Sequence, residues 1–177
     1  KSYGADVSTA ITVRLTWIQN LHKPVIGLEI GTMSLVGRFI GARDTDSVSD
    51  SVFSGLLLAS SYASIAALAF LFATDTMVLM FLESDSSTTP LKLAIWGTQL
   101  NAFIIFVISW SGILGGARRG AGDTYGTMTI SAVFWWLQYA LVVILIHWLG
   151  LRSDAVLTIH ILSSPLLFIA MVMRFQS

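Results

Sequence analysis

The chain alternates long apolar runs with short polar breaks. Uncharged runs extend over Ser51–Thr74, Leu93–Ala117 and Thr124–Leu151, and a shorter one covers Ala155–Met173. A helix needs roughly 20 apolar residues to cross about 30 Å of hydrocarbon. The first three runs exceed this length and the fourth still reaches across, so the pattern predicts helices that span a membrane.

The opening segment is less uniform. Arg14, Lys23 and Glu29 interrupt its apolar residues, and Pro24 restricts the backbone before it. Because proline removes a helical hydrogen bond and bends the helix that it interrupts, one long, kinked helix over residues 7–41 accommodates all of these features.

The predicted fold is therefore an all-α integral membrane bundle of about five transmembrane helices. We expect them at residues 7–41, 48–73, 91–116, 127–149 and 155–175, in a single lobe that occupies residues 1–177. The second helix is rich in Ala, Ser and Gly, which let membrane helices approach closely, and this predicts an interior position. After it, Asp75–Leu82 is expected to be a short amphipathic piece at the membrane interface.

The composition supports a membrane protein and excludes several kinds of chemistry. Of the 177 residues 55% are hydrophobic and 11% are charged, whereas about a quarter of a soluble domain is charged. The lack of cysteine excludes thiolate metal sites and thiol catalysis, and three scattered histidines offer zinc no paired spacing. A net charge of zero gives nucleic acid no basic surface to bind. We expect no enzyme, no metal site, no cofactor and no nucleic-acid partner, and the lipid bilayer as the surrounding medium.

The lysines and arginines at the span ends predict the orientation. One set comprises Arg38, Arg43, Arg118, Arg119 and Arg174, and the other comprises Lys23, Lys92 and Arg152. The larger set is expected in the cytoplasm, because cytoplasmic loops carry an excess of Lys and Arg.

On this topology, residues 115–126 (GGARRGAGDTYG) form a cytoplasmic turn between two spans. Basic, glycine-rich loops often cradle phosphates, but such a loop ends in Lys followed by Ser or Thr, and here Gly122 leads to Asp123 and Thr124. A turn anchored by arginines, made tight by glycines and capped by Asp123 explains the stretch better. Its key residues are Arg118, Arg119, Gly120, Gly122 and Asp123.

Glu29 is the only carboxylate well inside an apolar span. An acid at mid-bilayer costs about 2.5 to 3.5 kcal/mol on insertion scales, so Glu29 is expected to face the bundle interior, to pair, or to take up a proton. This makes it the candidate for coupling to a sodium ion or a proton. The alternative is a position near the outer interface, where Glu29 meets Lys23 or Arg14.

Polar side chains in the later spans are candidates for lining a transport pathway. They are Gln99, Asn101, Gln138 and Tyr139. Gln99 and Asn101 are too far apart in helical phase to share one narrow stripe, but both can face a wide cavity. Amides inside a span more often bond to neighbouring helices, and this alternative stays open.

Several stretches together resemble the multidrug and toxic compound extrusion (MATE) family. They are RGAGDT at 119–124, LVGRFIGARD at 35–44, RFQS at 174–177, and the opening SYGADVSTAITVRL with PVIGLEIG. The resemblance implies twelve helices in two six-helix lobes, which exchange cationic or amphipathic small molecules for sodium or protons. Residues 1–177 would be most of one lobe, and the RF-type ending resembles that of the C-terminal lobe, although the family has matching motifs in both lobes.

The resemblance also sets further expectations and alternatives. The chain has no initiator Met and ends directly after a span, so we expect a fragment whose partner is the missing lobe, in a bacterial inner membrane. Unlike some members of the family, it carries no carboxylate between Trp96 and Gly116. Two other functions stay open: a lipid-linked sugar flippase of the same superfamily, which would line its cavity with several cationic residues, and a membrane assembly subunit that does not transport.

Overall fold

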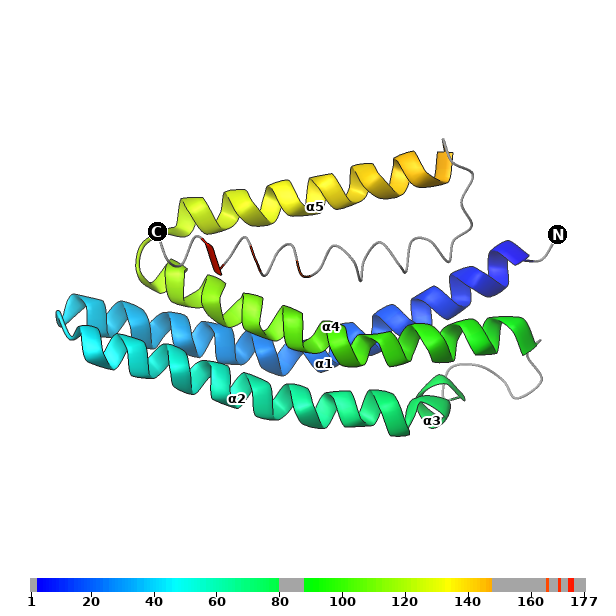
Figure 1. Cartoon of the computed structure of the whole chain (residues 1–177), viewed down its shortest axis with the longest axis horizontal. Helices are drawn as coiled ribbons and strands as arrows, with labels where there is room; N and C mark the ends of the chain where they lie inside the picture. The colour runs from blue at the N-terminus through cyan, green and yellow to red at the C-terminus, as the bar shows by residue number, and fades with distance from the viewer. Residues whose placement is uncertain (1–2, 80–87, 148–164, 166–168, 170–171, 174–177) are drawn as a thin grey trace.

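The structure is a computed structural model that describes residues 3–79, 88–147, 165, 169, 172 and 173. These residues form the helices α1 (Tyr3–Gly41), α2 (Thr45–Phe72), α3 (Thr74–Leu79), α4 (Thr88–Gly120) and α5 (Thr124–His147), as Figure 1 shows. The described part of the chain contains no strand, so the predicted all-α fold is confirmed. The span expected at 155–175 and the tail RFQS lie almost entirely outside the described residues.

The helices α1, α2 and α4 pack together along their lengths, and α5 lies on the far side of α4 from α2 (Figure 1). Helices α1 and α4 run in the same direction, since Gly112 of α4 lies against Glu29 and Gly120, two turns later, lies against Met33. Helix α2 runs the opposite way, with its Tyr62 hydroxyl donating a 2.8 Å hydrogen bond to the carbonyl oxygen of Leu21 on α1. The C-terminal ends of α1 and α4 therefore lie at the same end of the bundle.

Helix α1 continues through Pro24 as one helix of 39 residues. At 1.5 Å per residue it is about 58 Å long, well beyond the thickness of the hydrocarbon core. Figure 1 shows α1 changing direction near its middle, the region that contains Pro24 and its missing backbone donor. Lys23 consequently lies in the middle of this helix.

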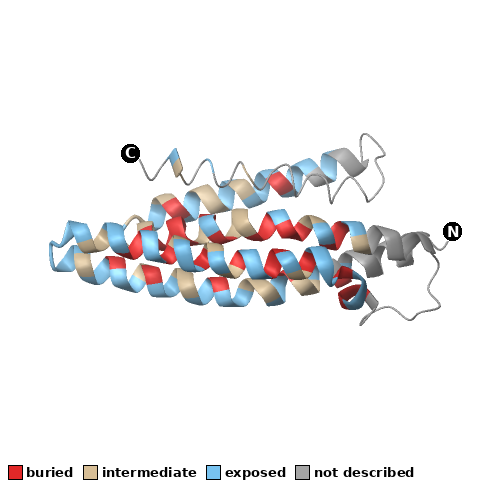
Figure 2. Ribbon diagram, turned by 60° about the horizontal axis from the view of Figure 1, so that its bottom comes forward, coloured by how far each residue is buried: buried red, intermediate tan, exposed pale blue. Residues whose placement is uncertain are grey.

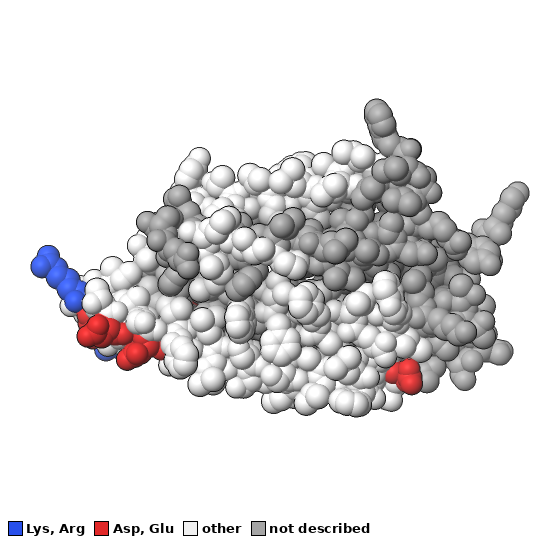
Figure 3. Space-filling model, viewed as in Figure 1, with Lys and Arg blue, Asp and Glu red and all other residues white. Residues whose placement is uncertain are grey.

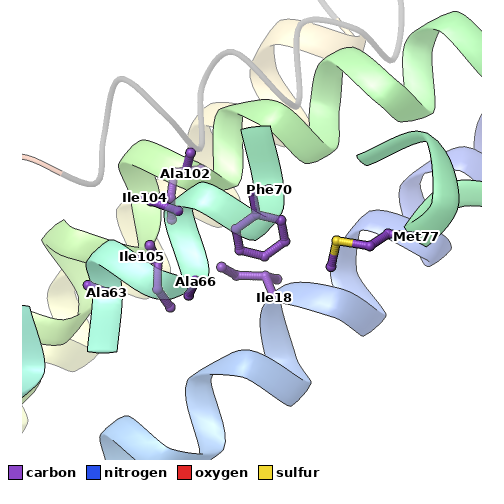
Figure 4. Close-up of a cluster of buried hydrophobic side chains, with 9 residues drawn as sticks. Ile18, Ala63, Ala66, Phe70, Met77, Ala102, Ile104 and Ile105 are labelled. Carbon is purple, nitrogen blue, oxygen red and sulfur yellow. The ribbon is translucent and has the colours of Figure 1, made fainter. Parts of the chain in front are cut away.

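The core is built from small residues of α2 and branched residues of α4. Figure 4 shows Phe70 and Met77 packed with Ile18 and with Ile104 and Ile105. Alanines of α2 complete this cluster and let the helices approach closely. The buried residues gather where α1, α2 and α4 face one another (Figure 2).

The short helix α3 folds against the bundle. The side chains of Met77 and Val78 are buried, and the indole nitrogen of Trp17 donates a 2.9 Å hydrogen bond to the carbonyl oxygen of Met77. Of the amphipathic piece expected at Asp75–Leu82, the described part up to Leu79 is thus helical and packs against the bundle, while Asp75 is exposed.

The outer surface is that of a membrane protein. Helix α2 and residues Ile95–Gly120 of α4 are long and apolar enough to cross a membrane. Large apolar side chains face outward along α2 and α5, among them Phe72 and Trp136, which are 83% and 73% exposed. On the face drawn in Figure 3, the described charged side chains gather near the ends of the bundle. This distribution suits a lipid environment, in which apolar surface carries no penalty.

The turn between α1 and α2 carries charged residues of its own. Asp44 caps α2 by accepting hydrogen bonds from the backbone nitrogen and the hydroxyl of Ser47, at 3.1 and 2.5 Å. These bonds favour the carboxylate form and hold the pKa of Asp44 below its ordinary value, mainly through the hydroxyl. Arg43 just before it has a φ of 59°, a left-handed conformation that ends α1.

Candidate functional site

A cavity of about 440 Å³ opens between α1, α4 and α5. Its polar lining comprises Gln19, His22, Glu29, Ser111, Arg119, Thr127 and Ser131. Its apolar lining includes Leu15, Ile18, Val107, Ile108, Phe134 and Trp135. The volume is that of a pocket for a small organic molecule, and the mixture of an apolar wall with a few polar groups is typical of ligand sites.

Glu29 and Arg119 form an ion pair inside this cavity. The side chain of Glu29 is 18% exposed and that of Arg119 is 34% exposed, so the pair is only partly in contact with the surroundings. Arg119 comes from the last turn of α4. Helical side chains tilt toward the helix N-terminus, so Arg119 leans back into the bundle and reaches Glu29 on the parallel helix α1.

Glycines of α4 make room for Glu29. A Cβ atom on Gly112 would lie 3.0 Å from Oε2 of Glu29, and one on Gly116 would lie 2.6 Å from the backbone oxygen of Glu29. A Cβ atom on Gly120 would collide with the backbone oxygen of Met33. The spacing of four residues places these glycines on one face of α4, and the close approach of α1 and α4 depends on them.

His22 lines the same cavity, two turns before Glu29 on α1. Its Nε2 atom is buried and has no hydrogen-bond partner among the described residues. A buried polar atom without a partner costs free energy unless water or a ligand satisfies it. The imidazole therefore offers a polar contact to whatever occupies the cavity.

The two arginines of the predicted cytoplasmic turn have separate roles. Arg118 stays in the turn, where its Nε atom donates a 3.0 Å hydrogen bond to Asp123. Asp123 also accepts a 3.0 Å bond from the backbone nitrogen of Gly126, at the start of α5. Gly122 has a φ of 93°, the left-handed conformation that glycine adopts at little cost. Arg119, by contrast, leaves the turn and joins the cavity.

None of the four residues expected along a pathway lines this cavity. Gln99 and Tyr139 are exposed, and the ring of Tyr139 meets that of Trp136 edge to face at 6.4 Å. Asn101 is fully buried and Gln138 is 7% exposed. Gln99 and Asn101 point to different sides of α4, as their helical phase predicts.

Lys23, one of the two partners expected for Glu29, does not pair with it. The ammonium group of Lys23 donates a 2.8 Å hydrogen bond to Oδ1 of Asn20 instead. The side chain of Arg14 lies outside the described part of the chain. The partner that the structure gives to Glu29 is Arg119, 90 residues away in the sequence.

The sequence profile of the MatE family matches residues 3–144, most of the chain. The chain belongs to this family. MATE proteins are membrane transporters rather than enzymes. No curated protein matches the chain in sequence.

The fold of this MATE chain is also that of a solved structure. An inward-facing multidrug resistance MATE family transporter of the MOP superfamily is similar to it, with a TM-score of 0.80 and 22% sequence identity. The likeness covers 94% of this chain and 37% of that transporter, so this chain spans less than two fifths of the other's length. The match shows a shared fold.

Two residues of the MATE cavity escaped the sequence reasoning. Arg119 was interpreted as an anchor of the turn, and His22 received no role. The repeat of glycine at 112, 116 and 120 was the available signal, since it predicts a helix packed closely against this face of α4. Arg119 precedes the last of these glycines and so lies beside the packed face.

Among the described residues no group of His, Asp and Glu is arranged to hold a metal ion.

Proposed function

We propose that the full-length protein is a secondary transporter that exchanges amphipathic organic compounds for sodium ions or protons, and that Glu29 is where the coupling ion acts. The observation that carries this proposal is the ion pair of Glu29 with Arg119 inside the cavity between α1, α4 and α5. An ionisable residue within a membrane span marks an ion or substrate pathway more often than a purely structural contact.

The arginine suggests how coupling works. Arg119 supplies a positive charge opposite the carboxyl group of Glu29 within the bundle. A proton or a sodium ion that binds to the carboxylate of Glu29 must compete with the guanidinium group of Arg119. Arg119 is then left without its partner and favours an arrangement in which it reaches water. Occupation of Glu29 thereby changes the relative free energies of two conformations, which is the requirement for a coupled transporter.

The position of Arg119 connects this exchange to helix movement. It lies in the last turn of α4, directly before the turn that leads to α5. The ion pair thus connects the C-terminal half of α1 to the end of α4. Release of Arg119 loosens this end of the bundle, where glycines rather than large side chains form the contact.

The location and partners follow from the same proposal. The transporter would lie in a bacterial inner membrane, and a second lobe of the same polypeptide would supply the other wall of the pathway. An ion gradient would drive transport, so no bound cofactor or nucleotide is needed.

The test is transport by the full-length protein in liposomes, with sodium and proton gradients imposed separately on wild type and on Glu29→Gln. Asp50→Asn is the matched control, because Asp50 is an exposed carboxylate in the first turns of α2, outside the cavity. We expect Glu29→Gln alone to lose gradient-driven flux at equal protein abundance. Unchanged flux in Glu29→Gln would remove Glu29 from coupling. A wild type that moves no amphipathic compound under either gradient would refute exchange transport.

A further inference from the structure

The face of α1 that points away from the core carries polar side chains beside apolar ones such as Ile26 and Ile30. Its exposed side chains include Gln19, Asn20, Lys23, Ser34 and Arg38. Their spacing keeps them on one side of the helix, opposite the buried residues Val25 and Val36. We call Gln19, Asn20 and Lys23 the central polar patch of α1.

The central polar patch lies near the middle of the bundle's depth. Tyr62 is at the midpoint of the uncharged run Ser51–Thr74 of α2, and its hydroxyl bonds to the backbone of Leu21. On α4, the midpoint of the uncharged run Leu93–Ala117 is Ile105, which packs in one cluster with Ile18. Lys23 is two residues beyond Leu21, about 3 Å along the helix axis. Both neighbours of α1 therefore place Lys23 level with the middle of their uncharged runs, near the expected centre of the membrane.

Lys23 has an amide rather than a carboxylate as its neighbour. Its ammonium group donates to Oδ1 of Asn20 at 2.8 Å. In the described part of the chain the only carboxylates in ion pairs are Glu29 and Asp123, and both are paired with arginines. An exposed ammonium group facing lipid at this depth is costly, so the central polar patch is expected to face a water-filled pathway.

We propose that the central polar patch holds the transported compound, and that Lys23 recognises an anionic group on it. The compound would be an amphipath that carries a carboxylate, sulfonate or phosphate. This inference rests on the proposed transport function and names the substrate class. Because Oδ1 of Asn20 accepts from Lys23, the amide nitrogen of Asn20 is turned to donate to a second oxygen of the same anion.

The charge of Lys23 changes the expectation drawn from the sequence. The family resemblance implied cationic or amphipathic small molecules as substrates. A fixed positive charge near the middle of the pathway repels a simple organic cation and attracts an anion, most strongly where water is scarce.

The substrate and the coupling ion would use neighbouring positions on one helix. Lys23 and Glu29 are six residues apart, which is about 9 Å along α1 and about 120° around it. Glu29 lines the cavity between the helices, and Gln19 of the central polar patch reaches the same cavity, whereas Lys23 is exposed and outside its lining. The two charges therefore do not neutralise each other.

The experiment compares two fluorescent naphthalene probes that share the same apolar body, one with a sulfonate and one with a trimethylammonium group. Equilibrium binding to the purified full-length protein is measured for wild type, Lys23→Gln, Lys23→Arg and Lys23→Glu. Arg43→Gln is the control, since it also removes one exposed positive charge, but at the turn after α1. Binding does not require transport, so this readout stands even if gradient-driven exchange fails.

We expect wild type and Arg43→Gln to bind the sulfonate better than the ammonium probe. Lys23→Gln should bind the sulfonate about tenfold more weakly, Lys23→Arg should retain it, and Lys23→Glu should prefer the ammonium probe. Equal sulfonate affinity in wild type and Lys23→Gln, or a wild-type preference for the ammonium probe, would overturn the proposal.

A competition arm distinguishes the sources of the anion. Inorganic phosphate and vesicles containing phosphatidylglycerol are each added to the wild-type protein with bound sulfonate probe. Displacement by phosphate at low concentration would show that a water-soluble anion suffices and would overturn the amphipathic substrate, and displacement by the vesicles supports a lipid headgroup as the source of the anion. If both fail while Lys23→Gln still lowers sulfonate binding, the anion must be part of a larger amphipath, as proposed.

Discussion

Glu29 on α1 and Arg119 on α4 are 90 residues apart in the sequence and form an ion pair within the helix bundle. The pair connects the C-terminal half of one long helix to the last turn of another that runs parallel to it. Glycines on α4 let the two backbones come close enough for this contact. The same pair therefore joins the packing of the lobe to the proposed coupling site.

Neutralising either partner of this pair should destabilise the protein. For Glu29→Gln or Arg119→Gln we expect the free energy of unfolding to fall by about 1–2 kcal/mol, less than the 3–5 kcal/mol for a fully buried pair, because both side chains are partly exposed. The double variant should lose less than the sum of the two single losses. Denaturant unfolding of the full-length protein in detergent measures this cycle, and strictly additive losses would show that the two charges do not interact.

Adding one methyl group to α4 should separate α1 from it. In Gly116→Ala the new Cβ would lie 2.6 Å from the backbone oxygen of Glu29, so the helices must move apart, at a cost of roughly 1–3 kcal/mol. Gly27→Ala is the matched control, because no atom lies within 4 Å of a Cβ placed there. Thermal unfolding should show a lower midpoint for Gly116→Ala only. Equal midpoints for the two variants would mean that the close approach of α1 and α4 is not needed.

Removing the cap of α5 should loosen the turn after α4. Asp123→Ala loses the bonds to Gly126 and Arg118, and we expect a loss of about 1–2 kcal/mol in stability. Asp123→Asn keeps the cap but not the charge and should lose less. Amide hydrogen exchange at Gly126 and Thr127 is the measurement. If exchange there is as slow in Asp123→Ala as in wild type, the cap does not stabilise the start of α5.

The cap of α2 should make stability depend on acid pH. Because its hydrogen bonds hold the pKa of Asp44 below the ordinary value, the unfolded chain binds a proton more readily than the folded one. The stabilisation by Asp44 is therefore complete above a pH of about 4 and is lost as the pH falls through the lower, folded-state pKa. The free energy of unfolding should be measured for wild type and Asp44→Ala between pH 7 and pH 2. The difference between the two proteins should shrink only below a pH of about 4. A difference independent of pH would contradict this origin.

The helical, membrane-embedded fold was predictable from the sequence. Runs such as Ser51–Thr74 are apolar over a length that suits a spanning helix, and a short helical piece was expected near Asp75, where α3 lies. The MATE resemblance rested on motifs in the right order, and the family match supports it. These features depend on residues close together in the chain, which a reading of the sequence can weigh directly.

The candidate site was predictable only in part. Glu29 stood out because a carboxylate within an apolar span is rare, but its partner was sought nearby, at Lys23 or Arg14. His22 carried no signal of its own, since one histidine in a helix is common and only its place in the cavity makes it notable. The candidates Gln99 and Tyr139 had suitable chemistry but face other directions.

Hydropathy along each run suffices to predict membrane-spanning helices. The free energy of transfer into hydrocarbon is a sum over neighbouring side chains, so it can be read from a short stretch of sequence. Hydropathy does not establish which charges meet or how deep each one lies. Those follow from the offset of one helix along another, which the contacts of Gly116 with Glu29 and of Tyr62 with Leu21 set in this protein. That offset brings Arg119 to Glu29 and places Lys23 near the middle of the bundle, and both depend on close packing between residues far apart in the chain.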